Sequence, residues 1–232
     1  KELDFSHLKT TISGGMALTH SAADMWQGVT GCTIQEGYGL TETAPVVSIN
    51  PSDDIRIGTI GKVVAGTQVK VIGEDGADLG FDNEGELCVK GPQVMAGYWQ
   101  QTEATANVLD ADGWFKTGDV AILAEDGFIR LVDRIKDMII VSGFNVYPNE
   151  IDDIGSEHPG IVECAAVGIP NEVSGETVKL FVVKSDPSLT EADVIAHCRA
   201  NLTAYKVPKE VEFKDELPKT NVGKILRRAL RD

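Results

Sequence analysis

The chain has 232 residues, of which 42% are hydrophobic and 25% are charged, and its mean hydropathy is -0.06. These values are typical of globular proteins and exclude disordered and fibrous classes. The net charge of -15 would repel phosphate backbones and anionic lipid surfaces, which argues against nucleic-acid binding, and no apolar run approaches the roughly 20 residues of a membrane-spanning helix.

The beginning of the chain and its cysteines indicate the cellular compartment. The chain opens at Lys1 in a polar segment that lacks a Met and the features of a signal peptide. We therefore expect it to begin inside a larger protein, and we expect no export. The four cysteines are scattered, without a C-x-x-C pair or a histidine at ligand spacing, so reduced thiols in a cytosol are expected rather than a zinc site or a redox pair.

Glycines and β-branched runs dominate the first two-thirds of the chain and predict a β-rich region. The expected strands lie at residues 69–72, 86–90, 120–123 and 128–132. A turn at Glu125–Gly127 joins the last two strands into a hairpin. Only residues 21–28 and 102–108 have a helical pattern in this part.

After Asp133 the pattern changes to strands that alternate with helices. Strands are expected at 138–141, 164–167 and 180–183, and helices at 149–158 and from Thr190 onward. The second of these helices places four side chains near one face: Val194, Ile195, Cys198 and Leu202. Gly155 inside the first helix should cost roughly 1 kcal/mol relative to Ala, and the sequence provides no reason for it. We predict an α+β protein with two domains, 1–135 and 136–232.

The strongest local signal is Glu36–Glu42, which brings two glycines, an aromatic ring, a hydroxyl and a carboxylate into one predicted turn. Gly37 and Gly39 would let the backbone approach a planar base, on which Tyr38 can stack. Thr41 can donate to a phosphate, and the carboxylate of Glu42 can hold a hard cation. The third glycine of a dinucleotide fingerprint is missing. By itself, a tight turn explains the motif at least as well as a nucleotide loop.

Two further motifs carry groups suited to a nucleotide. Asp119, which closes Lys116–Asp119, offers two acceptor oxygens to the two hydroxyls of a ribose. Lys224 closes Pro218–Lys224 and supplies an ammonium group, which can stabilise negative charge on a phosphate. Taken alone, an aspartate in a turn and a surface lysine are the simpler interpretations.

Together these motifs resemble those of the adenylate-forming family, which comprises acyl-CoA synthetases, adenylation domains of peptide synthetases and luciferases. Ser13–Gly15 resembles the adenine-side glycine loop of the family, and Gly85–Gly91 resembles its strand motif; all of the motifs occur in the family order. The resemblance implies a β-rich carboxyl-terminal remnant of the large AMP-binding domain, expected as a distorted β-barrel subdomain, followed by a small, mobile α+β lid domain.

The resemblance also implies roles for individual residues. The groups expected to bind ATP are Gly14, Gly15, Gly37, Tyr38, Gly39, Thr41, Asp119 and Arg134. The expected catalytic residues are Lys224, Thr41 and Glu42, and Glu42 is also the expected ligand of Mg²⁺. Lys136 is the expected hinge, about which the small domain would rotate between two half-reactions. Gly143 is expected to line the channel for the pantetheine arm of CoA.

Longer stretches at 89–95, 141–151 and 215–228 resemble bacterial long-chain fatty acyl-CoA synthetases. The implied enzyme is cytoplasmic, uses a long-chain fatty acid, ATP, Mg²⁺ and CoA, and meets its acid at the inner face of the membrane. The acyl-chain preference and the oligomeric state are not predicted. The phosphate loop of the family should lie upstream of Ser13 and is not in this sequence, so we expect the chain alone to be inactive.

Two alternatives stay open. One is an acyl-adenylate ligase that loads a carrier protein instead of CoA, although the insertion typical of such ligases is not evident around Lys136. The other is a nucleotide-binding module that has lost catalysis. The presence of Glu42, Asp119 and Lys224 argues against the second alternative.

Overall fold

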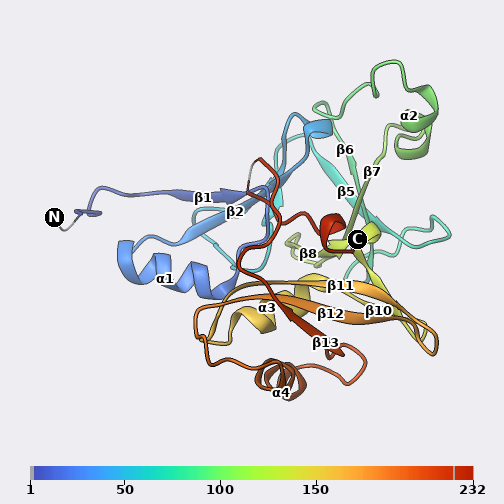
Figure 1. Cartoon of the computed structure of the whole chain (residues 1–232). Coiled ribbons are helices and arrows are strands. Elements are labelled where there is room, and N and C mark those ends of the chain that lie inside the picture. The colour runs from blue at the N-terminus through green and yellow to red at the C-terminus, as the bar shows by residue number, and fades with distance from the viewer. Residues whose placement is uncertain (1–2, 222, 232) are drawn as a thin grey trace. The chain divides into compact units, whose positions relative to one another are not determined.

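The computed structural model describes residues 3–221 and 223–231 and divides the chain into two compact units, Lys1–Val132 and Asp133–Asp232. The predicted boundary was between Ile135 and Lys136. The first unit is rich in strands and the second mixes strands with helices, which confirms the α+β class (Figure 1). No helix within the described part of the chain is long and apolar enough to cross a membrane.

The first sheet of the first unit has the strand order β1-β2-β3-β4. Its strands are β1 (Thr11–Gly14), β2 (Ile34–Gly39), β3 (Val46–Ile49) and β4 (Lys62–Val63). Parallel strands need a crossover, and helix α1 (His20–Thr30) connects the parallel pair of β1 and β2. The Thr19 side chain caps α1 by accepting from the Ala22 amide, and Gly31 ends it in the left-handed conformation.

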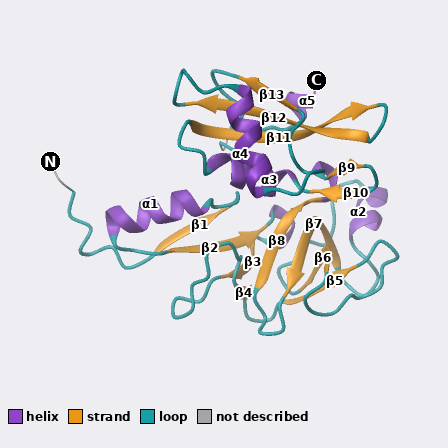
Figure 2. Ribbon diagram, turned by 90° about the horizontal axis from the view of Figure 1, so that it is seen from below, coloured by secondary structure: helices purple, strands orange, loops and turns teal. Residues whose placement is uncertain are grey.

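The second sheet of the first unit has the order β5-β6-β7-β8, and its strands lie side by side in Figure 2. The strands are β5 (Gln68–Ile72), β6 (Glu84–Lys90), β7 (Phe115–Leu123) and β8 (Ile129–Arg134), and helix α2 (Thr102–Val108) lies between β6 and β7 in the chain. One core joins the two sheets, with the buried side chains of Val47, Ile60, Leu87, Val89, Ala121 and Ile129. Both sheets are open, and the described strands form no closed barrel of the kind expected for this region.

The second unit is built on a five-stranded sheet with the order β10-β9-β12-β11 and with β13 paired to β12. Its strands are β9 (Ile139–Val141), β10 (Phe144–Val146), β11 (Ile161–Asn171), β12 (Gly175–Lys184) and β13 (Glu210–Phe213). Helices α3 (Pro148–Ser156) and α4 (Glu191–Asn201) cover one face of this sheet (Figures 1 and 2). Val194 and Cys198 are fully buried there, and Ile195 and Leu202 pack against the same core, as the helical pattern predicted.

The opposite face of the same sheet is covered by the end of the chain. Because side chains of a strand alternate between faces, Ala165 and Val167 of β11 point away from the helices. They pack with Phe181, Leu217 and Leu230 in a separate cluster. The last of these residues belongs to α5 (Arg228–Arg231). The tail that carries Lys224 is thereby anchored on the sheet.

The close approach of α3 to β11 explains Gly155. This residue is buried in α3, and a Cβ atom built on it would lie 2.7 Å from the Sγ atom of Cys164 on β11. Cys164 is itself buried, and its Sγ donates to the Asp152 carbonyl at 3.3 Å. Glycine lowers the helix propensity at this position, but because it has no Cβ atom it lets α3 lie close to β11.

Gly155→Ala is accordingly expected to destabilise the second unit. The gain in helix propensity is about 1 kcal/mol, but overpacking a filled core typically costs about 1–3 kcal/mol. Urea-induced unfolding should show a net loss in the free energy of unfolding. In a Cys164→Ala background the same substitution should become neutral or stabilising, and a stabilising effect with Cys164 present would contradict this explanation.

Candidate functional site

The predicted adenine-side glycines and the Glu36–Glu42 motif meet in the first sheet. Gly14, the last residue of β1, pairs with Gly37 of β2 in parallel register. A Cβ atom on Gly14 would lie 3.2 Å from the Gly37 carbonyl oxygen, so the close approach favours glycine. Gly15 follows with a φ of 88° and is exposed. Two motifs that are separate in the sequence therefore lie next to each other on the paired strands β1 and β2.

From its glycines we expected the Glu36–Glu42 motif to form a single turn, and the structure shows that this expectation was wrong. Its first part is the end of β2, and its last part opens a short 3-10 helix, η1 (Thr41–Thr43). Gly39 has a structural reason of its own, because a Cβ atom there would lie 1.8 Å from the Pro45 carbonyl oxygen. The Leu40 amide donates to that same oxygen at 2.9 Å. The motif thus leaves the sheet abruptly and presents Thr41 as an exposed side chain.

Tyr38 and Asp119, which are 81 positions apart in the sequence, are joined by a hydrogen bond. The Tyr38 hydroxyl donates to Oδ2 of Asp119 at 2.5 Å. Asp119 is 6% exposed, whereas Tyr38 is half-buried. The phenol therefore orients the carboxylate. This places the predicted stacking ring and the predicted ribose acceptor side by side.

A bulge in β7 determines where the Asp119 carboxylate lies. Glu86 pairs with Val120 and Cys88 with Lys116, so Leu87 alone faces residues 117–119. Gly118 adopts a φ of 73°, and its amide donates to the Glu86 carboxylate at 3.0 Å. Bulges redirect side chains and are frequent beside functional sites. The Lys116–Asp119 motif is therefore a bulge within strand β7 and not a turn between two elements.

Glu42 is held by a residue that the sequence analysis did not identify. The Tyr98 hydroxyl donates to Oε1 of Glu42 at 2.9 Å, and the Met95 amide donates to the Glu42 carbonyl at 2.8 Å. Burial and the Glu42 carboxylate raise the pKa of Tyr98, which keeps this donor protonated. No local pattern distinguishes Tyr98 in the sequence, because its partner lies 56 positions away.

The surroundings of Glu42 fit a magnesium ion only if a nucleotide supplies further ligands. Within the described part of the chain, no group of three or more His, Cys, Asp or Glu side chains is placed to hold a metal ion. Mg²⁺ commonly uses one or two protein carboxylates together with substrate phosphates and water. The single, half-buried carboxylate of Glu42 is compatible with that arrangement.

The predicted ribose contact Arg134 and the predicted hinge Lys136 lie near the start of the second unit. Arg134 ends β8 and Lys136 lies in the short 3-10 helix η2 (Ile135–Asp137); both side chains are exposed. The Lys136 carbonyl accepts a hydrogen bond from Arg231 Nη1 at 3.3 Å. A short exposed segment between two compact units is a suitable place for a hinge.

Gly143 lies in a two-residue hairpin turn between β9 and β10. Ser142 and Gly143 have φ values of 52° and 83°, the combination that such tight hairpins require. A Cβ atom on Gly143 would meet nothing within 4 Å. Its backbone conformation, and not crowding within the second unit, is therefore the structural reason for the glycine.

Lys224 lies in a loop that closes on itself. The Thr220 amide donates to the Lys224 carbonyl at 2.7 Å, and the Leu226 amide donates to the Pro218 carbonyl at 2.7 Å. Lys224 is half-buried and makes no ion pair with any residue that the structure describes. Val222, which belongs to the same motif, lies outside the described residues. The loop is thus well defined at its base and carries an uncommitted cation.

The predicted site residues fall into two groups. In the first unit, the structure joins Gly14 to Gly37 and Tyr38 to Asp119, and it places Thr41 beside Glu42. The second unit carries Arg134, Lys136, Gly143 and Lys224 on three separate segments. The first group has the acceptors and the ring that suit a nucleotide, and the second has a cation on an anchored tail.

Sequence models of known families match both parts of the chain. The model described as AMP-binding enzyme matches residues 1–99. The model described as AMP-binding enzyme C-terminal domain matches residues 150–224. The two matches follow the order of the two structural units.

Curated relatives and solved structures are similar over nearly the whole chain. The long-chain-fatty-acid–CoA ligase of Salmonella typhimurium is 57% identical over 233 residues, which is 100% of this chain and 41% of the ligase. A feruloyl-CoA synthase of Amycolatopsis sp. is 41% identical over 234 residues, 100% of this chain and 47% of that protein. The crystal structure of ATP-bound MatB from Rhodopseudomonas palustris is similar with a TM-score of 0.91 and 36% identity, over 96% of this chain and 44% of that one. The chain thus spans less than half the length of these proteins.

Proposed function

Because the chain belongs to the AMP-binding enzymes, we propose that it is the carboxyl-terminal part of an ATP-dependent ligase that joins a long-chain fatty acid to CoA. The observation that carries this proposal is the 57% identity to a long-chain-fatty-acid–CoA ligase, which extends over the entire chain and so includes both groups of site residues. The identity to the feruloyl-CoA synthase is lower, at 41%, which favours a fatty acid over an aromatic acid as substrate.

The proposed reaction has two steps. A carboxylate oxygen of the fatty acid attacks the α-phosphorus of ATP, and pyrophosphate leaves, so that an acyl-adenylate forms. The sulfur of CoA then attacks the acyl carbonyl, its thiol proton is released, and AMP leaves. The product is an acyl-CoA thioester.

The residues of the first unit would hold the nucleotide. Asp119 accepts from the ribose hydroxyls in a direction set by Tyr38, whose ring stacks on the base. Thr41 donates to a phosphate, and Glu42, held by Tyr98, is the magnesium ligand. The bound Mg²⁺ would neutralise charge on the phosphates. The support for these roles is the hydrogen bond between Tyr38 of β2 and Asp119 of β7, and the position of Thr41 and Glu42 directly after β2.

The residues of the second unit would serve the two steps in turn. Lys224 stabilises the negative charge that develops between the attacking carboxylate and the α-phosphate, without a proton transfer. Rotation about Lys136 then replaces it with the Gly143 turn, along which the pantetheine arm of CoA passes. Arg134 would be the second ribose contact. The exposed hinge segment and the open space around Gly143 support this assignment.

The wider setting is part of the same proposal. We place the enzyme in the cytoplasm, with peripheral contact to the inner face of the membrane, where a long-chain acid partitions. The four cysteines of the described chain are free thiols, which agrees with a reducing compartment.

Product analysis of the full-length enzyme that contains this chain tests the proposal. The enzyme is incubated with ATP, Mg²⁺ and palmitate, together with either CoA or a phosphopantetheinylated carrier protein, and the thioesters are identified by mass spectrometry. Palmitoyl-CoA is the expected product, and little palmitate should be found on the carrier protein. Transfer mainly to the carrier, or a preference for ferulate over palmitate, would contradict the proposed reaction, and binding of ATP without any thioester would indicate a non-catalytic module.

A further inference from the structure

The tail that carries Lys224 is fastened to the rest of the second unit by three ion pairs, each on a different element. They are Lys219 to Glu163 of β11 at 2.7 Å, Arg227 to Asp152 of α3 at 2.7 Å, and Arg231 to Asp137 of η2 at 3.4 Å. Exposed ion pairs contribute little to holding a geometry. The degree of burial therefore decides which pair matters most.

Arg227 makes the most buried of the three pairs. Its side chain is 12% exposed and that of Asp152 is 16% exposed, whereas the side chains of Lys219 and Arg231 are 43% and 33% exposed. Nη2 of Arg227 also donates to Oδ1 of Asn149 at 2.7 Å. One guanidinium nitrogen thus binds two residues of the first turns of α3. A mostly buried pair of this kind tolerates only a narrow range of positions.

Asp152 is itself fixed from its other side. Its Oδ1 accepts from the Ala166 amide of β11 at 2.6 Å, while Oδ2 faces Arg227. Burial raises the pKa of Asp152 to about 7, and the Arg227 guanidinium opposes that rise. The guanidinium therefore favours the charged form of this buried carboxylate, together with the Ala166 amide.

The contacts of Arg227 continue to the beginning of the second unit. The backbone amide of Asn149 donates to Oδ2 of Asp133 at 2.8 Å, and Oδ1 of Asp133 accepts from the backbone amide of Arg134 at 2.7 Å. Asp133 is 5% exposed, so this connection is buried. A continuous set of polar contacts therefore runs from the base of the Lys224 loop, through α3, to Arg134, two positions before the proposed hinge at Lys136.

We propose that Arg227 is the positioning residue of Lys224: by binding Asp152 and Asn149 it fixes the base of the lysine loop to α3 and, through Asp133, to the hinge end of the second unit. This inference rests on the proposed function. Lys224 is three positions before Arg227, and the Leu226 amide beside it closes the loop on Pro218 at 2.7 Å. A shift of Arg227 is thus transmitted directly to the loop that carries the ammonium.

The consequence is confined to one half-reaction. Only adenylation uses Lys224, and a misplacement of about 1 Å can reduce a rate roughly 100-fold. Arg227→Gln in the full-length enzyme is expected to slow acyl-adenylate formation, measured as fatty-acid-dependent exchange of pyrophosphate into ATP, by about 10- to 100-fold. Thioester formation from supplied acyl-adenylate and CoA should stay within about 2-fold of the wild type.

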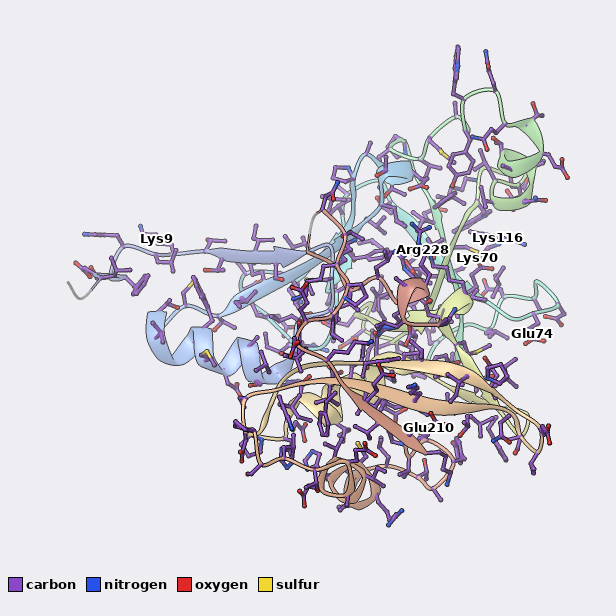
Figure 3. The ribbon with its side chains drawn as sticks, in the orientation of Figure 1. Lys9, Lys70, Glu74, Lys116, Glu210 and Arg228 are labelled. Carbon is purple, nitrogen blue, oxygen red and sulfur yellow. The ribbon has the colours of Figure 1, made fainter. Side chains whose placement is uncertain are left out.

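Arg228 provides the matched control. It follows Arg227 directly, lies on α5 (Figure 3), is exposed, and makes no ion pair with any residue in the described ranges. Arg228→Gln removes the same charge and should leave both half-reactions unchanged. Arg227→Lys keeps the charge but not the planar donor group, and it should recover part of the exchange rate.

A second variant separates positioning from folding. Arg227→Gln alone leaves Asp152 buried without its cation, which threatens the fold. The double variant Arg227→Gln/Asp152→Asn removes the charge as well, so it should melt near the wild-type temperature and still show the adenylation defect. Equal losses in both half-reactions, no loss in either, or full exchange activity in the double variant would overturn the inference. If Lys224→Ala itself spares exchange, the proposed function fails; if only the Arg227 variants spare it, the inference alone fails.

Discussion

Lys224→Ala in the full-length enzyme is expected to reduce acyl-adenylate formation by about 1,000-fold. Removing one preorganised donor from a developing oxyanion costs roughly 10²- to 10³-fold, and removing a cation from a phosphoryl-transfer site costs roughly 10³- to 10⁵-fold. Thioester formation from supplied acyl-adenylate should persist, because in the proposed mechanism rotation about Lys136 has moved this cation out of the site before CoA attacks. Pyrophosphate exchange and a CoA-consumption assay measure the two half-reactions separately.

Lys209 offers a control for the loss of a lysine from the same unit. It is exposed, and its amide, which the substitution retains, donates to the Val178 carbonyl at 2.9 Å. Lys209→Ala should behave as the wild type in both assays. If Lys224→Ala lowered the two half-reactions equally, its role would be structural, and the assignment of the lysine to adenylation would be wrong.

Asp119→Ala is expected to weaken ATP binding by roughly 10- to 100-fold. Each hydrogen bond to a charged group contributes about 1.5–3 kcal/mol, and about 1.4 kcal/mol corresponds to a factor of ten. The carboxylate is buried and already oriented by the Tyr38 hydroxyl, so a ribose would meet a preformed acceptor. Calorimetric titration with a non-hydrolysable ATP analogue measures the change in Kd.

The Tyr38 hydroxyl allows the ribose contact to be separated from the packing of the ring. Tyr38→Phe keeps the ring that would stack on the base and removes only the donor to Asp119. We expect a loss of a few-fold in affinity, well below that of Asp119→Ala, because the acceptor remains but is less well oriented. An unchanged ATP affinity in Asp119→Ala would exclude the ribose contact.

The elements with a clear period were predictable from the sequence, whereas β1 to β4 and β13 were not among the expected strands. The helix from Thr190 has a capping box with Asp193 and an apolar face that forms part of the core, so its local pattern and its tertiary contacts agree. The Glu36–Glu42 motif was predicted as a turn because of its glycines, yet Gly37 is a strand residue paired with Gly14. The partner strand outweighs the low strand propensity of glycine there.

Residue types in the motifs are the basis on which the chemistry of the site is proposed. A ring and a hydroxyl near two carboxylates, and a lysine after Pro-Lys-Thr, follow from the order of residues alone, as does the change from a β-rich to a mixed region near Asp133. These are properties of short stretches of chain, and the periodicity of side chains encodes them locally.

Only the tertiary structure decided which partners hold the predicted residues in place. Tyr98 binds Glu42 across 56 positions, Arg227 binds Asp152 across 75, and Gly155 is needed because Cys164 lies against α3. Hydrogen bonds and steric contacts act over a few ångströms in space, whatever the separation along the chain. The sequence therefore names the groups that are proposed to act, and the fold selects the residues that hold them in place.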